Sequence, residues 1–211
     1  MAKRNPEQTK ERILAAAIDV FSSQGLGGAR IDAIAARAGA NKRMIYHYFG
    51  NKDQLFVHVL EAVYTHIRSH ERELSLGDLD PEAAMRELVR YTFVYFVENP
   101  HFIRLLNNEN LYEAAHLKRL PAIRDMHMPL TEQIGAILNR GVAAGVFRDG
   151  VDPVQLYISI AGVGYFYLSN VHTLSTIFGR PLGSPDAIAD RRRHVIDVVM
   201  GYLRPDGDEH G

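Results

Sequence analysis

The sequence predicts an all-α protein with a small three-helix head joined to a larger helical body. Apolar residues recur at helical spacing along most of the 211 residues, and runs of β-type alternation are absent. Helix starts are marked by Asn, Asp or Ser directly before Pro, because the polar side chain caps free amides and proline suits the first helical position. These pairs are Asn5-Pro6, Asp80-Pro81, Asn99-Pro100, Asp152-Pro153 and Ser184-Pro185. We expect about nine helices.

The first two helices of the head are predicted from their apolar spacing. Apolar residues recur from Ile13 to Phe21, which indicates an amphipathic helix of about four turns that ends near Gly25. A second helix of about two turns starts at Ile31 and ends at Gly39. Its inward face is predicted to be Ile31, Ile34, Ala35 and Ala38. Two such helices need a third to complete a small core.

The third helix is very short and follows Asn41, a suitable N-cap. Ile45 and Phe49, four residues apart, are expected to face the core. The residues left for a partner are Lys42, Arg43, Met44, Tyr46, His47 and Tyr48. Helix, tight turn and short helix in this order are typical of a DNA-reading helix-turn-helix, and Arg or Lys there can reach guanine edges. We therefore predict binding to double-stranded DNA.

Charge is distributed unevenly along the chain. The whole chain carries a net charge of −1, whereas residues 1–54 are net +4 and the remainder net −5. A basic head is drawn toward a polyanion and binds it in a salt-dependent way. Lys3 and Arg4 form a possible flexible arm for the same partner.

The head resembles the TetR family of bacterial transcription regulators. The residues that carry the resemblance are Arg12, Ile13, Leu14, Ala16, Phe21, Gly25, Ile34, Ala35, Ala38, Gly39, Ile45, Tyr46, Tyr48, Phe49, Lys52, Leu55 and Phe56. After Phe56 the similarity is architectural, with a Gly145-Val-Phe147 turn before a long apolar helix. The resemblance implies an N-terminal DNA-binding domain and a C-terminal domain that binds an effector and dimerises.

The resemblance also implies roles for individual residues of the head. Residues expected to face base edges are Lys42, Arg43, Met44 and His47, and residues expected to hold phosphates are Tyr46, Tyr48 and Lys52. The family usually has Ser or Thr where this chain has Ala29-Arg30, so Arg30 is expected to contact a phosphate through its charge. Phosphate contacts position the protein, and base contacts give specificity.

The body is expected to span residues 53–204, before a loose tail of residues 205–211. A helix from Lys52 to about Glu73 is expected to join it to the head, residues 1–52. The segment from Pro153 to about Phe178 is apolar almost all round, and the last helix carries a second apolar stripe. Packed against their mates, these two long helices would form a four-helix homodimer interface, as the resemblance also implies. The alternative is that they fill the core of a monomer.

Aromatic residues of the body could line a cavity for a small-molecule effector, which the resemblance implies. The candidates are Tyr91, Tyr95, Phe102, Asn107, Met126, His127, Tyr157 and Phe166, with Asn108 and Gln133 as further polar groups. We expect the effector to be partly apolar. The alternative is that aromatic residues at helical spacing are ordinary core.

The sequence offers no catalytic or metal chemistry. The chain has no cysteine, which excludes disulfides and thiolate metal sites and fits a reducing compartment. His58, His66 and His70 share a helix face, and a solvated face is favoured over a metal site because no further ligand pattern accompanies them. No nucleophile elbow or paired carboxylates are found, and no apolar run is long enough to span a bilayer. We expect neither enzyme activity nor a cofactor, and a soluble, cytoplasmic protein.

Together these patterns predict a homodimeric, ligand-responsive transcription regulator, most consistent with a repressor that its effector releases from the operator. One alternative is a helical small-molecule-binding or enzymatic domain that does not bind DNA specifically. An activator or a co-repressor-dependent protein would share the same residues.

Overall fold

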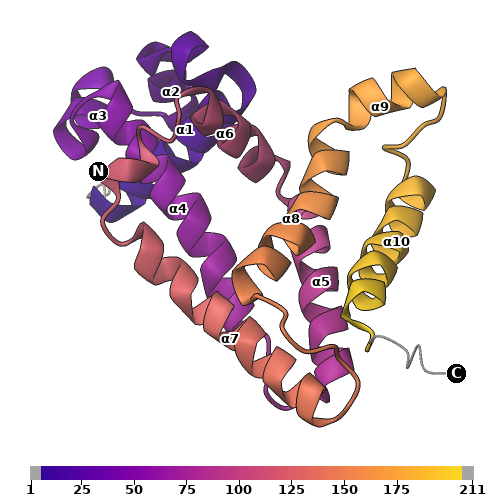
Figure 1. The fold of residues 1–211 in the computed structure, drawn as a ribbon. Helices are drawn as coiled ribbons and strands as arrows, with labels where there is room; N and C mark the ends of the chain where they lie inside the picture. Colours follow the sequence, from indigo (N-terminus) through magenta and orange to yellow (C-terminus); the bar gives the residue numbers. More distant parts are fainter. Residues whose placement is uncertain (1–5, 206–211) are drawn as a thin grey trace, which may run out of the picture. The chain divides into compact units, whose positions relative to one another are not determined.

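The computed structural model describes residues 6–205, which are all-helical as predicted (Figure 1). The described chain forms ten α-helices and one short 3-10 helix, against about nine helices expected, and contains no strand. The elements are α1 (Pro6–Gly28), α2 (Ile31–Ala38), α3 (Lys42–Phe49), α4 (Lys52–Glu73), α5 (Pro81–Glu98), α6 (Pro100–Leu111), η1 (Leu117–Arg119), α7 (Ile123–Ala143), α8 (Pro153–Ser169), α9 (Val171–Phe178) and α10 (Pro185–Leu203).

The described residues divide into two compact units. Unit 1 contains residues 6–66 and 100–124, and unit 2 contains residues 67–99 and 125–205. Helix α4 begins in unit 1 and contributes its last two turns to unit 2. The division predicted near residue 52 concerns function, and it stays a prediction. The expected arm at Lys3 and Arg4 and residues 206–211 of the expected tail lie outside the described residues.

Unit 1 has the small shared core that the apolar spacing predicts. The buried side of α2 is Ile31, Ile34, Ala35 and Ala38, and the buried side of α3 is Ile45 and Phe49. The Phe21 ring of α1 meets the Phe56 ring of α4 edge to face, with 5.1 Å between centroids. Such edge contacts stabilise aromatic pairs beyond simple area burial. Gly39 ends α2 in the left-handed conformation, at φ 58°, which produces the tight turn before α3.

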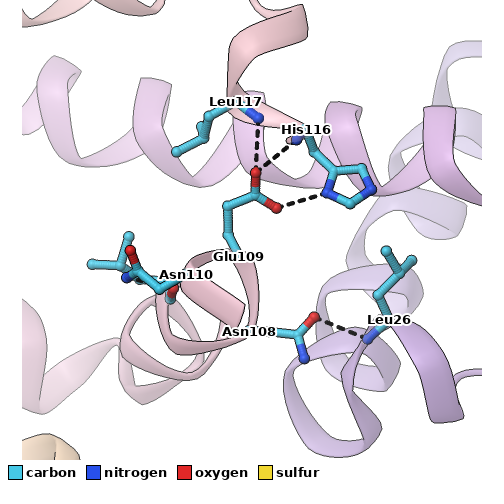
Figure 2. A network of polar contacts seen from close by, with 7 residues as sticks. Leu26, Asn108, Glu109, Asn110, His116 and Leu117 are labelled. Atoms are coloured by element: carbon cyan, nitrogen blue, oxygen red, sulfur yellow. Dashed lines mark hydrogen bonds and ion pairs between the residues drawn. The ribbon is translucent and has the colours of Figure 1, made fainter. Parts of the chain in front are cut away.

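Helix α1 kinks at Gly25, and α6 supports the kink. Gly25 has φ +69° and ψ 168°, values that side-chain-bearing residues rarely adopt. The Asn108 carbonyl accepts a 3.0 Å hydrogen bond from the Leu26 amide, which the kink has freed from the helix (Figure 2). A Cβ at Gly25 would lie 2.7 Å from the Asn108 amide nitrogen. This position therefore needs glycine for both conformation and space.

A buried carboxylate holds the chain segment that follows α6. Glu109 accepts hydrogen bonds from the backbone amides of His116 and Leu117, at 2.7 and 2.9 Å, and from the His116 ring at 2.8 Å (Figure 2). Two residues in this segment, Glu113 and Ala114, have positive φ values of 53° and 59°. Left-handed backbone at non-glycine residues costs free energy, and the three bonds to Glu109 offset that cost.

The core of unit 2 lies between α5, α7, α8 and α10. Helix α5 packs against both α8 and α10, and the buried side chains include Leu88 and Phe93 of α5 and Ile160 of α8. The guanidinium of Arg140 on α7 donates to three backbone carbonyls of the turn before α5, at 2.8 to 3.1 Å. The Arg140 side chain thereby supplies the hydrogen-bond donors for most of the backbone carbonyls of this turn, which makes few backbone hydrogen bonds itself.

Most of the predicted helix starts are confirmed. Asp80, Asp152 and Ser184 each accept a hydrogen bond from the amide three residues later, and the following proline occupies the first turn. Asn99 differs: α6 does begin at Pro100, but the Asn99 side chain donates back to the Tyr95 carbonyl at 2.9 Å. Its amide group therefore closes α5, and the expected cap on α6 stays a prediction. Asn5 lies outside the described residues.

The single long helix predicted from Pro153 to Phe178 is wrong, because it is two helices. The backbone leaves the helical region at Asn170, with φ −112° and ψ 13°. The Asn170 side-chain amide donates to the Phe166 carbonyl at 2.8 Å. Asparagine competes with regular helical bonding in this way, a local effect that the apolar pattern does not reveal.

Candidate nucleic-acid interface and ligand site

Helix α3 is positioned by its cap and by its two core anchors. The Asn41 side chain accepts a 2.9 Å hydrogen bond from the Met44 amide, which satisfies one of the free donors at the helix start. Ile45 and Phe49 fix the inner face, with 1% and 8% of their surface exposed. The short helix therefore presents its opposite face to solvent within unit 1.

The outward face carries the residues expected to read bases. Lys42, Arg43 and His47 are exposed, and Met44 is half-buried. The Lys42 ammonium lies 2.7 Å from the Asp32 carboxylate on α2, and both side chains are more than half exposed. An exposed pair of this kind is weak, because water and salt screen it. Lys42 can therefore exchange Asp32 for an anionic partner at little cost.

The residues expected to hold phosphates surround this face. The Tyr46 side chain is 48% exposed, while Tyr48 is half-buried, with the Lys10 ammonium 5.9 Å from the centre of its ring. The Lys52 ammonium donates to the Ala29 carbonyl at 3.1 Å, next to exposed Arg30, whose side chain does not cap α2. An ammonium has three donors, and this bond uses one of them to tie α4 to the start of α2.

Unit 2 contains a buried ion pair that was not foreseen. The guanidinium of Arg68 and the carboxylate of Glu71, one turn apart on α4, approach to 2.7 Å, and each side chain is 3% exposed. Their contact is close but poorly aligned, so neither Glu71 oxygen accepts a hydrogen bond, and Arg68 Nε and Nη1 also have no hydrogen-bond partner. Arg68 Nη2 donates to the Tyr157 hydroxyl at 3.1 Å. The pair lacks the hydrogen bonds that normally compensate buried charges.

Burial changes the ionisation of the groups around this pair. Burial raises the pKa of Glu71 to about 7, although the positive charge of Arg68 opposes the change. Burial, with a further contribution from the Glu71 carboxylate, raises the pKa values of Tyr91 and Tyr95 far above the usual range. The Tyr91 hydroxyl is buried without a hydrogen-bond partner. Strong pKa shifts at buried, poorly paired groups are a feature of functional sites.

A small cavity of about 20 Å³ adjoins the ion pair. It is lined by Arg68, Glu71, Arg72, Met126, Pro129, Leu130 and Gln133. This volume is about that needed for one water molecule. A larger, more open hollow of about 460 Å³ lies along α5 and α10 and includes Phe93, Val97 and Ile188. That hollow has no buried, unpartnered polar atom among its lining residues, so the ion-pair cavity is the stronger candidate site.

The expected effector residues are only partly brought together. Tyr157 contacts Arg68, Met126 lines the small cavity, and Tyr91 and Tyr95 lie near Glu71. His127 is half-buried. Phe102 and Asn107 belong to unit 1, where the Phe102 ring packs against Tyr64 at 5.4 Å as part of the core. Phe166 on α8 is 60% exposed and is not among the residues that line these two hollows.

The sequence contains little signal for Arg68 and Glu71. Charged residues three apart on a helix are usually a solvated surface pair, and the apolar residues that bury this pair come from other helices. Arg191 is a similar case: it belongs to a run of three arginines, yet it donates to the Val163 carbonyl on α8 at 3.0 Å and lies 5.0 Å from the Tyr167 ring centre.

The described chain has neither a metal-binding cluster nor a membrane-spanning helix. Residues 6–205 hold no cluster of three His, Asp or Glu side chains placed to bind a metal ion. Across the same residues, every helix is too short or too polar to traverse a bilayer.

The head geometry and the helical body define a class: a helix-turn-helix, DNA-binding transcription regulator that responds to a ligand. Comparison with known families agrees. Residues 13–59 match the model of bacterial regulatory proteins of the tetR family, and residues 81–199 match the tetracyclin repressor-like C-terminal domain. The chain belongs to the tetR family, whose members are regulators and not enzymes.

Relatives and solved structures extend along nearly the whole chain. The chain is 38% identical to the HTH-type transcriptional repressor NicS of Pseudomonas putida, over 94% of this chain and 93% of NicS. It is 33% identical to the HTH-type transcriptional repressor SCO4008 of Streptomyces coelicolor, over 93% of this chain and all of SCO4008. The fold is similar to FadR from Bacillus subtilis, solved with stearoyl-CoA, at a TM-score of 0.69, 16% identity and coverage of 92% and 100%.

Proposed function

We propose that this protein is a homodimeric repressor that binds a palindromic operator through α3 and leaves it when a small molecule binds unit 2. The observation that carries the proposal is the outward face of α3, which is basic, exposed and held rigid by the Asn41 cap and two core anchors. The repressor names of NicS and SCO4008 support the sign of control. Such a regulator works where the bacterial chromosome is, in the cytoplasm.

The proposal assigns base contacts to one edge of α3 and phosphate contacts to its surroundings. Lys42, Arg43, Met44 and His47 face base edges, with Lys42 leaving Asp32 as it enters the major groove. Tyr46, Tyr48, Lys52 and Arg30 hold the phosphates on either side. Base contacts specify the operator, and phosphate contacts set the register and the salt dependence.

The proposed dimer forms through α8 and α10. These helices contact each other within unit 2, and both expose apolar side chains spaced one or two turns apart: Val154, Ile158 and Phe166 on α8, and Val198 and Tyr202 on α10. Exposed apolar rows of this length commonly mark protein interfaces. Two helices from each of two copies give a two-fold interface, which matches two reading helices to half-sites about 34 Å apart.

Effector control follows from population shift. The small molecule binds unit 2 more tightly in a conformation that misplaces the two α3 helices than in the operator-bound conformation. Only this difference in affinity can release the DNA. Helix α4 is the element that both units share, and its last turns carry Arg68 and Glu71.

Gel shifts with the intergenic DNA next to the chain's own gene test the assignment. We expect Arg43→Ala to weaken operator binding about tenfold or more and to relax base choice at one position. Lys52→Ala should weaken binding to every sequence alike and lower the salt slope. Asp32→Ala is the matched control, because it frees Lys42 without removing a DNA contact, and it should bind at least as tightly as wild type. Equal affinity for all variants would contradict the assignment.

A second candidate function is a helical ligand-binding domain without operator recognition, favoured only by the buried polar site in unit 2. The same gel shifts separate the two. Retention that is independent of sequence and disappears at modest salt would indicate general attraction to a polyanion, and the operator-binding proposal would then fail.

A further inference from the structure

The buried guanidinium of Arg68 in unit 2 is only partly hydrogen-bonded. Arg68 is almost fully buried, and two of its three guanidinium nitrogens lack a hydrogen-bond partner. The Glu71 carboxylate lies 2.7 Å from Arg68 Nη1 and neutralises its charge, but it does not replace the hydrogen bonds that the buried guanidinium loses with water. A fold that needed this position only for stability would be served as well by an apolar residue. The arrangement is therefore better explained as one half of a binding site.

The charges lining the cavity specify the sign of the ligand. Arg68 and Arg72 contribute two positive charges, and Glu71 contributes one negative charge at most. The other lining residues are Gln133 and apolar side chains, with no further charged group. An anion is therefore attracted, whereas a cation would face an uncompensated arginine.

We infer that Arg68 is the anchor for the carboxylate group of a small monoanionic effector, and that the Glu71 carboxylate occupies this position on Arg68 when no effector is bound. A planar carboxylate matches the planar donors of a guanidinium. A phosphate with two charges fits less well, because Met126, Pro129 and Leu130 form an apolar wall and the cost of desolvation rises steeply with charge. This inference rests on the proposed function, since it names the ligand class of the same regulatory site.

Binding of the anion is coupled to a proton on Glu71. When the ligand carboxylate takes the place beside Arg68, two carboxylates share one guanidinium, and like charges at this distance disfavour each other. Because burial already raises the pKa of Glu71 to about 7, the side chain takes up a proton at little cost and becomes a donor to the ligand. The polar groups around Glu71 are Arg68, Arg72, Gln133, Tyr91 and Tyr95. Arg68 and Arg72 are cations, and burial raises the pKa values of both tyrosines, so they stay neutral.

The apolar body of the effector requires the cavity to open. At about 20 Å³ the cavity is too small for more than one water-sized group. Pro129 lies inside α7 and lines the cavity. Proline has no amide to donate to the carbonyl four residues earlier, so the first turn of α7 is held by fewer hydrogen bonds than the rest. Displacement of this turn, which carries Met126, is the proposed opening.

Matched ligand pairs on the full-length protein test the inference. The probes are benzoate, phenylacetate and hexanoate, each with its primary amide as a neutral control of nearly the same shape. At least one carboxylate should raise the melting temperature as its concentration increases, while its amide leaves the melting temperature unchanged. Titration calorimetry should show affinity falling about tenfold per pH unit above about pH 7, because one proton is bound with the ligand.

Two variants separate the anchor from general destabilisation. Glu71→Gln imitates the protonated carboxyl, so the affinity of this variant for the carboxylate ligand should not depend on pH. Its affinity at about pH 8 should equal the affinity of wild type at about pH 6. Arg68→Gln should abolish binding, and Glu73→Gln, on the same helix, should leave it unchanged. If Arg68→Gln fails to fold, the pH profile of Glu71→Gln still decides the question.

Several outcomes would overturn the inference. An anion anchored on Arg68 would be excluded by any of three results. The amides stabilise the protein as well as the carboxylates do, the affinity for the carboxylate increases with pH, or no carboxylate changes the melting temperature. Gel shifts on the same samples keep the two proposals apart. If the wild-type protein binds its operator but does not respond to the carboxylates, only the inferred ligand class is contradicted. If the wild-type protein binds no operator, the proposed function is contradicted.

Discussion

At the scale of single residues, the buried carboxylates of Glu109 in unit 1 and Glu71 in unit 2 have opposite roles. Glu109 accepts three well-aligned hydrogen bonds and stabilises a strained segment of unit 1. Glu71 lies against a cation yet accepts none. Both carboxylates are buried, so burial does not distinguish these roles. Hydrogen-bond geometry does, because aligned donors compensate a buried carboxylate for lost hydration and misaligned donors do not.

Replacing Glu109 should destabilise the protein strongly. Glu109→Ala leaves the amides of His116 and Leu117 buried without their acceptor, and we expect a loss of about 3 kcal/mol in the free energy of unfolding. Urea titration followed by circular dichroism measures it. Asn110→Ala, on the next position of α6, is the control, because Asn110 is exposed and its side chain donates to the Leu106 carbonyl of its own helix. Equal stability of the two variants would contradict the role given to Glu109.

Glu71 predicts a distinctive dependence of stability on pH. In the folded chain Glu71 keeps its proton to about pH 7, whereas in the unfolded chain it loses it near the ordinary value of 4.5. Between these values the folded state binds more protons, so this contribution to stability falls as pH rises. Glu71→Gln removes the contribution. The stability of the variant relative to wild type should therefore increase as the pH rises from 4.5 to about 7. Parallel curves of unfolding free energy against pH for the two proteins would contradict a raised pKa of Glu71.

At the scale of helices, starts were easier to predict than interruptions. A capping residue before proline is a local signal, and three such starts have the expected cap in the structure. The kink at Gly25 and the break at Asn170 depend on single side chains, Asn108 for the first and Asn170 itself for the second. Asn108 is 83 residues away from Gly25 in the chain, so no local pattern contains the pairing.

Alanine substitutions at two nearby glycines should have opposite effects on α1. Gly25→Ala forces a left-handed alanine and brings its Cβ to 2.7 Å from Asn108, so we expect a loss of about 2 kcal/mol. Gly27 has ordinary helical space, with its nearest contact at 3.5 Å, so Gly27→Ala should be neutral or stabilise by up to about 1 kcal/mol. Thermal denaturation of both variants checks this. If both variants shift the melting temperature in the same direction and by similar amounts, the kink does not require glycine at position 25.

At the scale of the whole molecule, function requires a second copy. In the proposed function one α3 helix contacts only one half-site, and the apolar rows on α8 and α10 have no cover within the described chain. The proposed dimer explains both features. It also gives Phe166 a role, because its exposed ring belongs to the apolar row of α8 in the proposed interface.

Phe166→Asp should produce a folded monomer that has lost operator binding. The ring is 60% exposed, so the fold of one chain barely depends on it, while a buried carboxylate at a two-fold interface faces its own copy and is strongly unfavourable. Analytical ultracentrifugation and gel shift measure the two effects. Leu111→Asp is the control, because Leu111 is 81% exposed on α6 and lies outside the proposed interface. A Phe166→Asp protein that remains dimeric would place the interface elsewhere.

The sequence by itself determined the all-helical class, the inward and outward faces of α2 and α3, most helix starts and the family, because each rests on spacing and on neighbours a few residues apart. Only the tertiary structure decided which charges are buried. Arg68 and Glu71 look like a solvated pair until Tyr91, Tyr95 and Met126, from two other helices, surround them. Hydration decides the ionisation and the reactivity toward ligands of a charged group, and hydration is set by residues that are distant in the chain.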